Sequence, residues 1–408
     1  MVLITPRRAL LATAAGGGLI ALGAGLKVGF APRRVADERP RDMLVAVFLR
    51  FGCDGLTLLA PAEDPHYRAA RPGIGVTTAG DRAGPLIGAL DGVPFVLHPA
   101  AAGLKPLYDA GQLAFVHAAG LPIDTRSHFE SQEMMERGIV ERNDPVLGGW
   151  LARHLMSSGR TLPELGAIAA AADIQASLAG FAGAVAIPDV AEFNVPGGDL
   201  NLGVIAALNA GAEVHATAAR DTVDMIRRVR ARYALLPPAA PPVPYPAGDF
   251  AAAMQSLAKL VKMNVGVEVA AVDFGGWDHH YQMNQYFPGH ARQLAETLAA
   301  FWADLAHVRE RVTIVAMTEF GRRLDENTAG GTDHGSASVM LVLGASVAGG
   351  RIHGRWPGLA PDQLREGDLR VTTDARAVLQ EILVTRRGEP APEQVFPGLP
   401  YAPVGVVG

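Results

Sequence analysis

Five stretches of the chain combine apolar side chains with many β-branched residues, which is the pattern of buried strands. These stretches are residues 43–50, 112–118, 267–273, 312–317 and 339–344. Between the third and the fourth, residues 291–308 have the length and composition of a helix. A strand, a helix and a second strand in this order form a parallel crossover. The pattern therefore predicts an α/β fold with a mostly parallel central sheet.

Further helices are expected around this sheet. They are predicted at residues 101–110, 130–137, 250–263 and 375–385, with another beginning at Gly149. Residues 155–250 are rich in alanine and poor in catalytic residue types, and we expect a mostly helical insertion there. The 408 residues are enough for one large core, so we expect a single α/β domain over residues 41–408.

The N-terminal residues have the features of an export signal. Arg7 and Arg8 precede an apolar run of alanine, glycine and leucine that extends to Phe30. This order resembles a bacterial twin-arginine signal, whose cargo crosses the membrane already folded. A plain membrane anchor is the alternative, although Lys27 and the many glycines make a poor permanent span. We expect residues 1–40 to be signal and linker. The protein would then be periplasmic or in the cell envelope, tethered to the membrane if the signal is uncleaved.

Charge and cysteine content argue against two kinds of function. The net charge is -5, and no basic stripe is present that could neutralise the phosphates of a nucleic acid. Cys53 is the single cysteine of the chain, which excludes an internal disulfide and any cysteine-based zinc site.

Residue types that bind metals lie at the ends of the predicted strands. They are Asp54 after the first strand, Asp278 and His280 after the third, Glu319 after the fourth, and Asp333 and His334 before the fifth. Ligands bind at the carboxyl ends of strands in open α/β sheets, so we expect these side chains to meet at one edge. Each alone has a structural explanation, as a turn residue or as a buried His–Asp pair. Their joint occurrence favours a site.

The turn after the second strand places hydroxyl groups before a predicted helix. Thr125 and Ser127 stand in this turn, where the positive end of the helix dipole would stabilise an alkoxide and attract anions. The alternative is a capping box formed by Ser127 and Glu130. Capping leaves Arg126 and His128 without a role.

The ligand types also indicate the metal. Carboxylates and imidazoles without thiolates favour zinc, or another divalent ion such as manganese or calcium. The sequence is compatible with one ion or two.

Taken in order, these motifs resemble a known family. From Arg50 to about Leu383 the chain is similar to the exported bacterial proteins designated DUF1501. The motifs that carry the resemblance are Asp54-Gly55-Leu56, Arg126-Ser127-His128-Phe129, Gly276-Trp277-Asp278-x-His280, Glu319-Phe320-Gly321-Arg322, Gly331-Thr332-Asp333-His334-Gly335 and Trp356-Pro357-Gly358. That family is placed with the alkaline phosphatase/sulfatase-like superfamily, so the resemblance implies a three-layer α/β/α sandwich.

The resemblance also implies roles for individual residues. In the superfamily, an Asp after the first strand binds a metal, a hydroxyl or thiol at a helix start is the nucleophile, and later Asp and His residues complete the ligands. Mapped in order, these roles fall on Asp54, Ser127 or Thr125, Asp278 with His280, Glu319, and His334. The Asp-His pair of the superfamily is replaced here by Glu319-Phe320, so one imidazole is missing. The candidates to fill a one-metal or mixed two-metal site are His128, Asp333 and Arg322.

These implications define an expected activity. We expect a metal-dependent hydrolase of phosphate or sulfate esters, with Arg126 or Arg322 binding the ester oxygens. The substrate would be a small anionic ester or an envelope glycan or lipid. The alternatives are a non-catalytic envelope protein that keeps the fold, and a transferase of phospho-headgroups onto envelope glycan or lipid.

Overall fold

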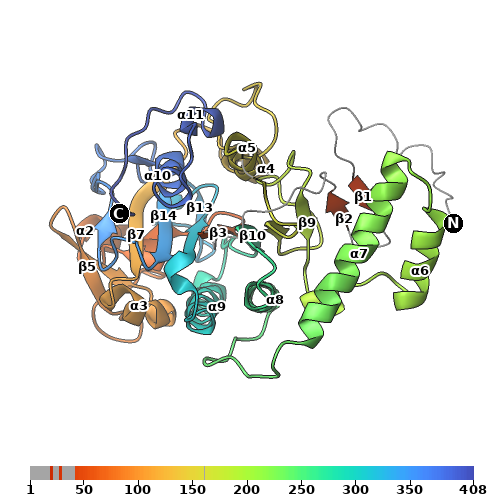
Figure 1. Cartoon of the computed structure of the whole chain (residues 1–408). Coiled ribbons are helices and arrows are strands. Elements are labelled where there is room, and N and C mark those ends of the chain that lie inside the picture. The colour runs from red at the N-terminus through yellow and green to blue at the C-terminus, as the bar shows by residue number, and fades with distance from the viewer. Residues whose placement is uncertain (1–18, 22–26, 30–41, 160) are drawn as a thin grey trace.

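The structure is a computed structural model that describes residues 19–21, 27–29, 42–159 and 161–408 (Figure 1). The predicted twin-arginine pair, Arg7 and Arg8, lies outside the described residues. No helix within the described ranges has the length and apolar character needed to cross a bilayer.

A large, mostly parallel sheet runs through the centre of the molecule. Its strands in spatial order are β1 (Leu19–Ala21), β2 (Lys27–Gly29), β9 (Ala184–Ala186), β8 (Ala167–Ala169), β10 (Val269–Phe274), β3 (Met43–Leu49), β11 (Val312–Met317), β14 (Ser338–Gly344), β7 (Leu113–Gly120) and β15 (Ile352–His353), with β16 (Thr373–Asp374) also paired to β7. Two small sheets contain β12 (Arg322–Glu326) with β13 (Thr332–His334), and β4 (Leu59–Ala60) with β6 (Val93–Leu97) and β5 (Leu86–Leu90). The five predicted strands and the mixed α/β class are confirmed.

The helices are mostly where the sequence predicts them. They are α1 (Gly55–Leu58), α2 (Pro65–Ala70), α3 (Lys105–Asp109), α4 (His128–Arg137), α5 (Trp150–Ser157), α6 (Gly198–Leu208), α7 (Val214–Ala234), α8 (Asp249–Lys262), α9 (Met283–Asp304), α10 (Ala375–Arg387) and α11 (Pro392–Val395), with 3-10 turns at Pro99–Leu104, Val190–Glu192 and Arg309–Arg311. Helix α9 begins eight residues before the predicted start at Ala291. Pro288, which lies inside this helix, concealed its first turns because proline is usually read as a helix breaker.

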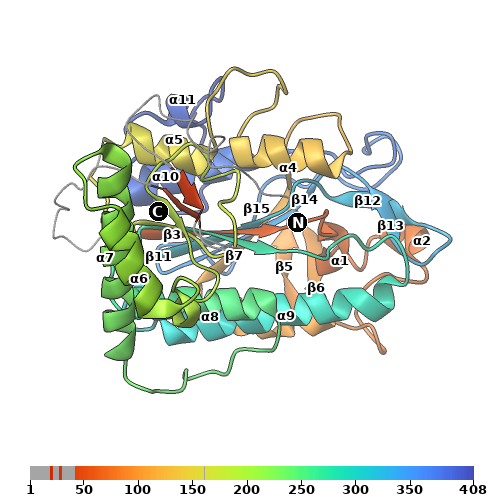
Figure 2. The same cartoon turned by 90° about the vertical axis from the view of Figure 1, so that its right-hand side faces the viewer.

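Helices cover both faces of the sheet, α8 and α9 on one and α4, α5 and α10 on the other (Figure 2). Strand β3 packs against the helices on both faces of the sheet, and all seven of its residues are buried. Val45 and Val47 belong to the same apolar cluster as residues of α8 and α9. Leu44 and Phe48 belong to the cluster that includes residues of α4, α5 and α10. This alternation follows from the period of two along a strand.

Residues 155–250, expected to be mostly helical, also contribute β8 and β9 to the large sheet. Both strands are only three residues long and consist of alanine with one isoleucine or valine. Such short segments carry too little β-branched character to be recognised as strands. The helical part is α6 and α7, which lie at one end of the molecule (Figure 1).

Strand directions bring the predicted ligands to one edge of the sheet. Strands β10 and β11 both pair in parallel with β3, and β14 runs antiparallel to β11 and to β7. The carboxyl ends of β3, β7, β10 and β11 therefore meet at the same edge as the start of β14. This edge carries the candidate site.

Candidate metal centre

Three segments supply the imidazoles of the site. His128 is the first residue of α4, after the turn that follows β7. His280 lies in the loop after β10, together with Asp278. His334 is the last residue of β13, four residues before β14 begins. Each segment starts from the same edge of the sheet, which is why residues far apart in sequence meet there.

The side chains converge on a small volume. Ligand atoms of His128, Asp278 and His334 all lie within 4.8 Å of one another, a spacing that could hold a metal ion. His280 joins this group, with Nε2 2.9 Å from His334 Nε2 and 3.2 Å from Asp278 Oδ1. We call these four residues the ligand cluster. Three imidazoles and one carboxylate form a donor set that suits zinc.

Each imidazole of the ligand cluster uses its Nδ1 atom in a second contact. The contacts are His128 Nδ1 to Glu319 Oε1 at 2.8 Å, His334 Nδ1 to the Arg126 carbonyl oxygen at 2.7 Å, and His280 Nδ1 to Asp333 Oδ1 at 3.2 Å. All three partners are acceptors, so in the neutral rings Nδ1 carries the hydrogen and Nε2 keeps its lone pair. Metal-binding histidines are commonly oriented in this way. Glu319 and Asp333, predicted as ligands, are placed as orienting partners.

Arg322, expected to bind substrate oxygens, has an internal role instead. It is 1% exposed and donates to Asp278 Oδ1 at 2.7 Å. The same guanidinium donates to the backbone carbonyl oxygens of Phe51, Gly52, Trp277 and Thr332. Burial acts to raise the pKa of Asp278, but the hydrogen bond and charge of Arg322 outweigh it, and the pKa is lowered. Arg322 therefore fixes an ionised Asp278 in place.

Other pKa shifts favour the protonation states that bind a metal. Burial lowers the pKa of His334, and the nearby charge of Arg322 lowers it further. Burial acts to raise the pKa of Glu319, but hydrogen bonds from His128 and Gln132 outweigh burial and lower the pKa. Neutral imidazoles beside ionised carboxylates are the state that metal binding requires.

Phe320, which stands in the sequence where the resemblance implies an imidazole, packs against two rings of the ligand cluster. Its ring stacks on His128, with centroids 4.8 Å apart, and lies 4.9 Å from the ring of His334. Phe51 meets His128 edge-on at 5.4 Å. The ligand cluster therefore has an apolar lining on this side.

Asp54 is not brought to the ligand cluster. Its side chain is 1% exposed and pairs with the equally buried Arg71 at 3.0 Å. The same carboxylate caps α1 by accepting from Thr57 N, and it accepts from the hydroxyl of Thr332. These partners make Asp54 part of a buried ion pair, and the structure does not bring it together with the other predicted ligands.

The two hydroxyl groups of the turn predicted to hold the nucleophile have different environments. Thr125 Oγ1 donates to Glu130 at 2.7 Å and accepts from Ser127 N at 3.2 Å. Ser127 occupies the N-cap position of α4, but its side chain makes no capping hydrogen bond, so the alternative of a capping box is not formed. Arg126, expected to bind ester oxygens, pairs with the buried Asp368 at 2.7 Å.

Sequence reasoning missed a group of residues behind the ligand cluster. Gln132 Nε2 donates to Glu319 Oε1 at 3.0 Å, and Arg50 donates to Gln132 Oε1 at 3.2 Å. Arg50 also pairs with Asp273 at 2.8 Å. The signal for Gln132 was its position four residues after His128, because residues at this spacing share a helix face.

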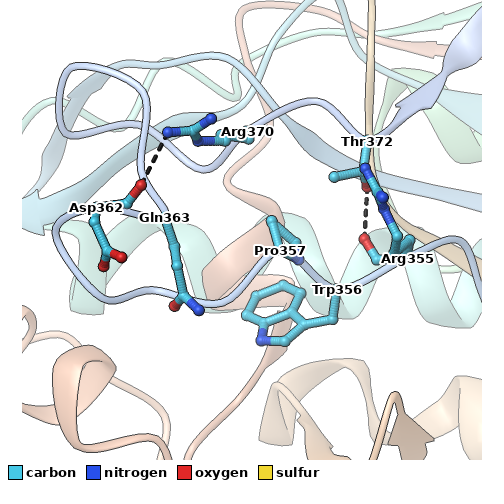
Figure 3. Close-up of a pocket in the computed structure, with 7 residues that line it drawn as sticks. All are labelled: Arg355, Trp356, Pro357, Asp362, Gln363, Arg370 and Thr372. Atoms are coloured by element: carbon cyan, nitrogen blue, oxygen red, sulfur yellow. Dashed lines mark hydrogen bonds between the residues drawn. The ribbon is translucent and has the colours of Figure 1, made fainter.

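Two surface hollows lie outside the ligand cluster. One, of about 380 Å³, contains Trp356 and Pro357 of a predicted motif (Figure 3). In it Arg370 donates to the carbonyl oxygen of Asp362, and Thr372 to that of Arg355. The other, of about 670 Å³, includes Asp273 and residues that follow β8 and β9. Neither hollow is lined by a residue of the ligand cluster, which is open to solvent, with Asp278 43% exposed.

Comparison with known proteins gives a family match over part of the chain and no activity. Residues 213–379 match the family described as "Protein of unknown function (DUF1501)". The matched range includes Asp278, His280 and His334 and excludes His128. No curated protein matches the chain. The match supports the DUF1501 family for this part of the chain.

Proposed function

We propose, from a family match that brings no activity with it, that this chain is a metal-dependent hydrolase of phosphate or sulfate esters in the bacterial envelope. We also propose that its sheet is that of the alkaline phosphatase/sulfatase-like superfamily. The position of the ligand cluster, at the carboxyl edge of a mostly parallel sheet, supports both proposals.

The proposal rests on one observation, the approach of two imidazole nitrogens. His280 Nε2 and His334 Nε2 are 2.9 Å apart, while the Nδ1 atom of each ring lies within hydrogen-bonding distance of another acceptor. Arg322 Nη1 lies 3.4 Å from His280 Nε2 and is not placed between the two rings by any shorter contact. Two lone pairs at this distance repel unless a cation or a proton lies between them. Carboxylates also outnumber cationic side chains around the ligand cluster, with Asp278, Asp333 and Glu319 against Arg322 and Arg323. A single divalent ion, zinc foremost, fits this environment.

Each residue of the site has its own role in the proposed reaction. His128, Asp278, His280 and His334 would hold the ion, which when bound supplies a Lewis acid beside the ester. Glu319 and Asp333 keep the Nε2 atoms aimed inward. Ser127 is the proposed nucleophile because its hydroxyl makes no capping bond, stands at the positive end of α4 and adjoins His128. Thr125 is less suited, because its hydroxyl is held by Glu130.

Elemental analysis of the purified protein, combined with a panel of p-nitrophenyl phosphate, bis-p-nitrophenyl phosphate and p-nitrophenyl sulfate, tests the proposal. We expect about one metal per chain and turnover of at least one ester. Both should fall in His334→Ala and stay unchanged in His215→Ala, whose imidazole is exposed on α7. Equal metal loss in the two variants, or no metal in the parent protein, contradicts the site. Full metal content with no turnover favours the non-catalytic alternative.

A further inference from the structure

Exposed aromatic residues adjoin the ligand cluster in the chain. In the described part of the chain, four aromatic side chains are more than 40% exposed: Phe129 at 84%, Tyr281 at 56%, Tyr401 at 47% and Tyr286 at 42%. Phe129 and Tyr281 lie in the segments that carry the ligand cluster, and Tyr286 lies in α9, the helix that follows the loop of Asp278 and His280. We call these three the aromatic rim.

Two residues of the aromatic rim are chain neighbours of ligand residues. Phe129 directly follows His128 and Tyr281 directly follows His280, so each Cα lies about 3.8 Å from the Cα of a ligand residue. The ring of Tyr286, in the first turn of α9, lies 5.8 Å from that of Tyr281 at an angle of 77°. The adjoining ligands are themselves accessible, with the His280 side chain 37% exposed.

The fold does not explain this exposure. Large apolar side chains left in water forgo the stabilisation that burial gives, and exposed aromatics gathered at one place mark binding surfaces. A charged cluster flanked by aromatic rings fits a ligand that has both an anionic group and an apolar face.

The shape and charge of the region narrow the class of ligand. Tyr281 and Tyr286 meet at 77°, so they form a corner and cannot sandwich a planar base between parallel faces. The net charge of -5 argues against a polyanion such as nucleic acid. A pyranose ring presents a flat C–H face to an aromatic ring and hydroxyl groups to tyrosine oxygens. We infer that the aromatic rim binds a sugar ring and that the organic part of the substrate is a glycan.

The inference that the substrate is an ester of a glycan rests on the proposed function, whereas the inference that the aromatic rim binds a sugar ring does not. The experiment therefore uses neutral probes: maltohexaose, cellohexaose and chitohexaose, measured by saturation-transfer NMR with and without added zinc. At least one should bind, with saturation strongest at the ring C–H protons. Phe129→Ala and Tyr281→Ala should each weaken binding about three- to tenfold. Tyr401→Ala, which removes an aromatic side chain of similar exposure outside the rim, should leave binding unchanged.

Two results overturn the inference: no binding of any of the three oligosaccharides, or binding that Phe129→Ala and Tyr281→Ala leave intact. Neither result depends on metal content or ester turnover. A failure of sugar binding is therefore distinguishable from a failure of the proposed hydrolase.

Discussion

His128 shows how a single carboxylate sets the properties of a proposed metal ligand. Glu319 is 1% exposed and also accepts hydrogen bonds from Phe51 N and from Gln132. Its oxygen is therefore fixed before His128 binds to it. An ionised acceptor held in place at Nδ1 of His128 raises the basicity of its Nε2 atom, which faces the other members of the ligand cluster.

Glu319→Gln should lower zinc affinity about 10- to 100-fold, because the neutral amide weakens this orienting contact. Competition with a chromophoric chelator measures the change. Glu326→Gln is the matched control, since Glu326 accepts backbone hydrogen bonds from Gly73 and Ile74 away from the ligand cluster. An unchanged affinity in Glu319→Gln would remove Glu319 from the site.

Ser127→Ala should abolish turnover while metal content and melting temperature stay near those of the parent. The hydroxyl makes no capping bond, so the usual cost of removing a cap, about 1 kcal/mol, should not appear. Loss of a nucleophile typically reduces the rate by orders of magnitude. Thr125→Ala should show the reverse, a lower melting temperature with activity retained. If both variants keep full activity on a confirmed substrate, covalent catalysis from this turn is wrong.

At the scale of elements, the C-terminal tail is held by one buried carboxylate of α10. Glu381 accepts backbone hydrogen bonds from Val404, Gly405 and Val407, and Val406 between them is fully buried. Glu381→Ala should lower the free energy of unfolding by about 3 kcal/mol, because it leaves several buried donors unpaired. Calorimetry measures the loss, and amide exchange should show the tail released. Glu393→Ala, on the exposed side of α11, should have little effect on either quantity.

Elements with long apolar runs could be predicted from the sequence, and those with short runs could not. The apolar run of β3 is seven residues long and predicts a buried strand, whereas three-residue β8 and β9 become strands by pairing with β10, with β2 and with each other. The site follows the same division. Asp278, His280 and His334 meet because strand direction decides where they lie. Asp54 does not join them, because it pairs with Arg71. This pairing could not be predicted, because the two residues are seventeen positions apart in sequence and no sequence pattern indicates that they meet.

For the whole molecule, stability should depend on buried histidines as the medium becomes acidic. Burial lowers the pKa of His117 to about 4, and burial also lowers those of His98 and His279 to about 4. The geometry of His117 explains why its ring stays neutral. Nε2 donates to the Leu59 carbonyl oxygen and Nδ1 accepts from Ala118 N, so a second ring hydrogen would face an N–H group.

Because the folded pKa of His117 lies below the unfolded value of about 6.5, the unfolded chain binds more protons between these two values. The contribution of His117 is fully present above pH 6.5 and is lost as the pH falls toward 4. Urea unfolding across this range should show stability decreasing with acidity. His117→Gln should reduce the slope by about 1.4 kcal/mol per pH unit. An unchanged slope in this variant would contradict the assignment.

The ligand cluster also has a consequence for the order in which the chain matures. Its members come from residue 128, residues 278–280 and residue 334, and they meet only after β7, β10 and β14 have taken their places in the sheet. Contacts between segments so distant in sequence form late in folding. An ion therefore cannot initiate folding here and would enter a nearly complete structure. If Arg7 and Arg8 direct export of a folded chain, as the sequence predicts, the compartment in which the protein folds, and not the one in which it works, decides which metal it carries.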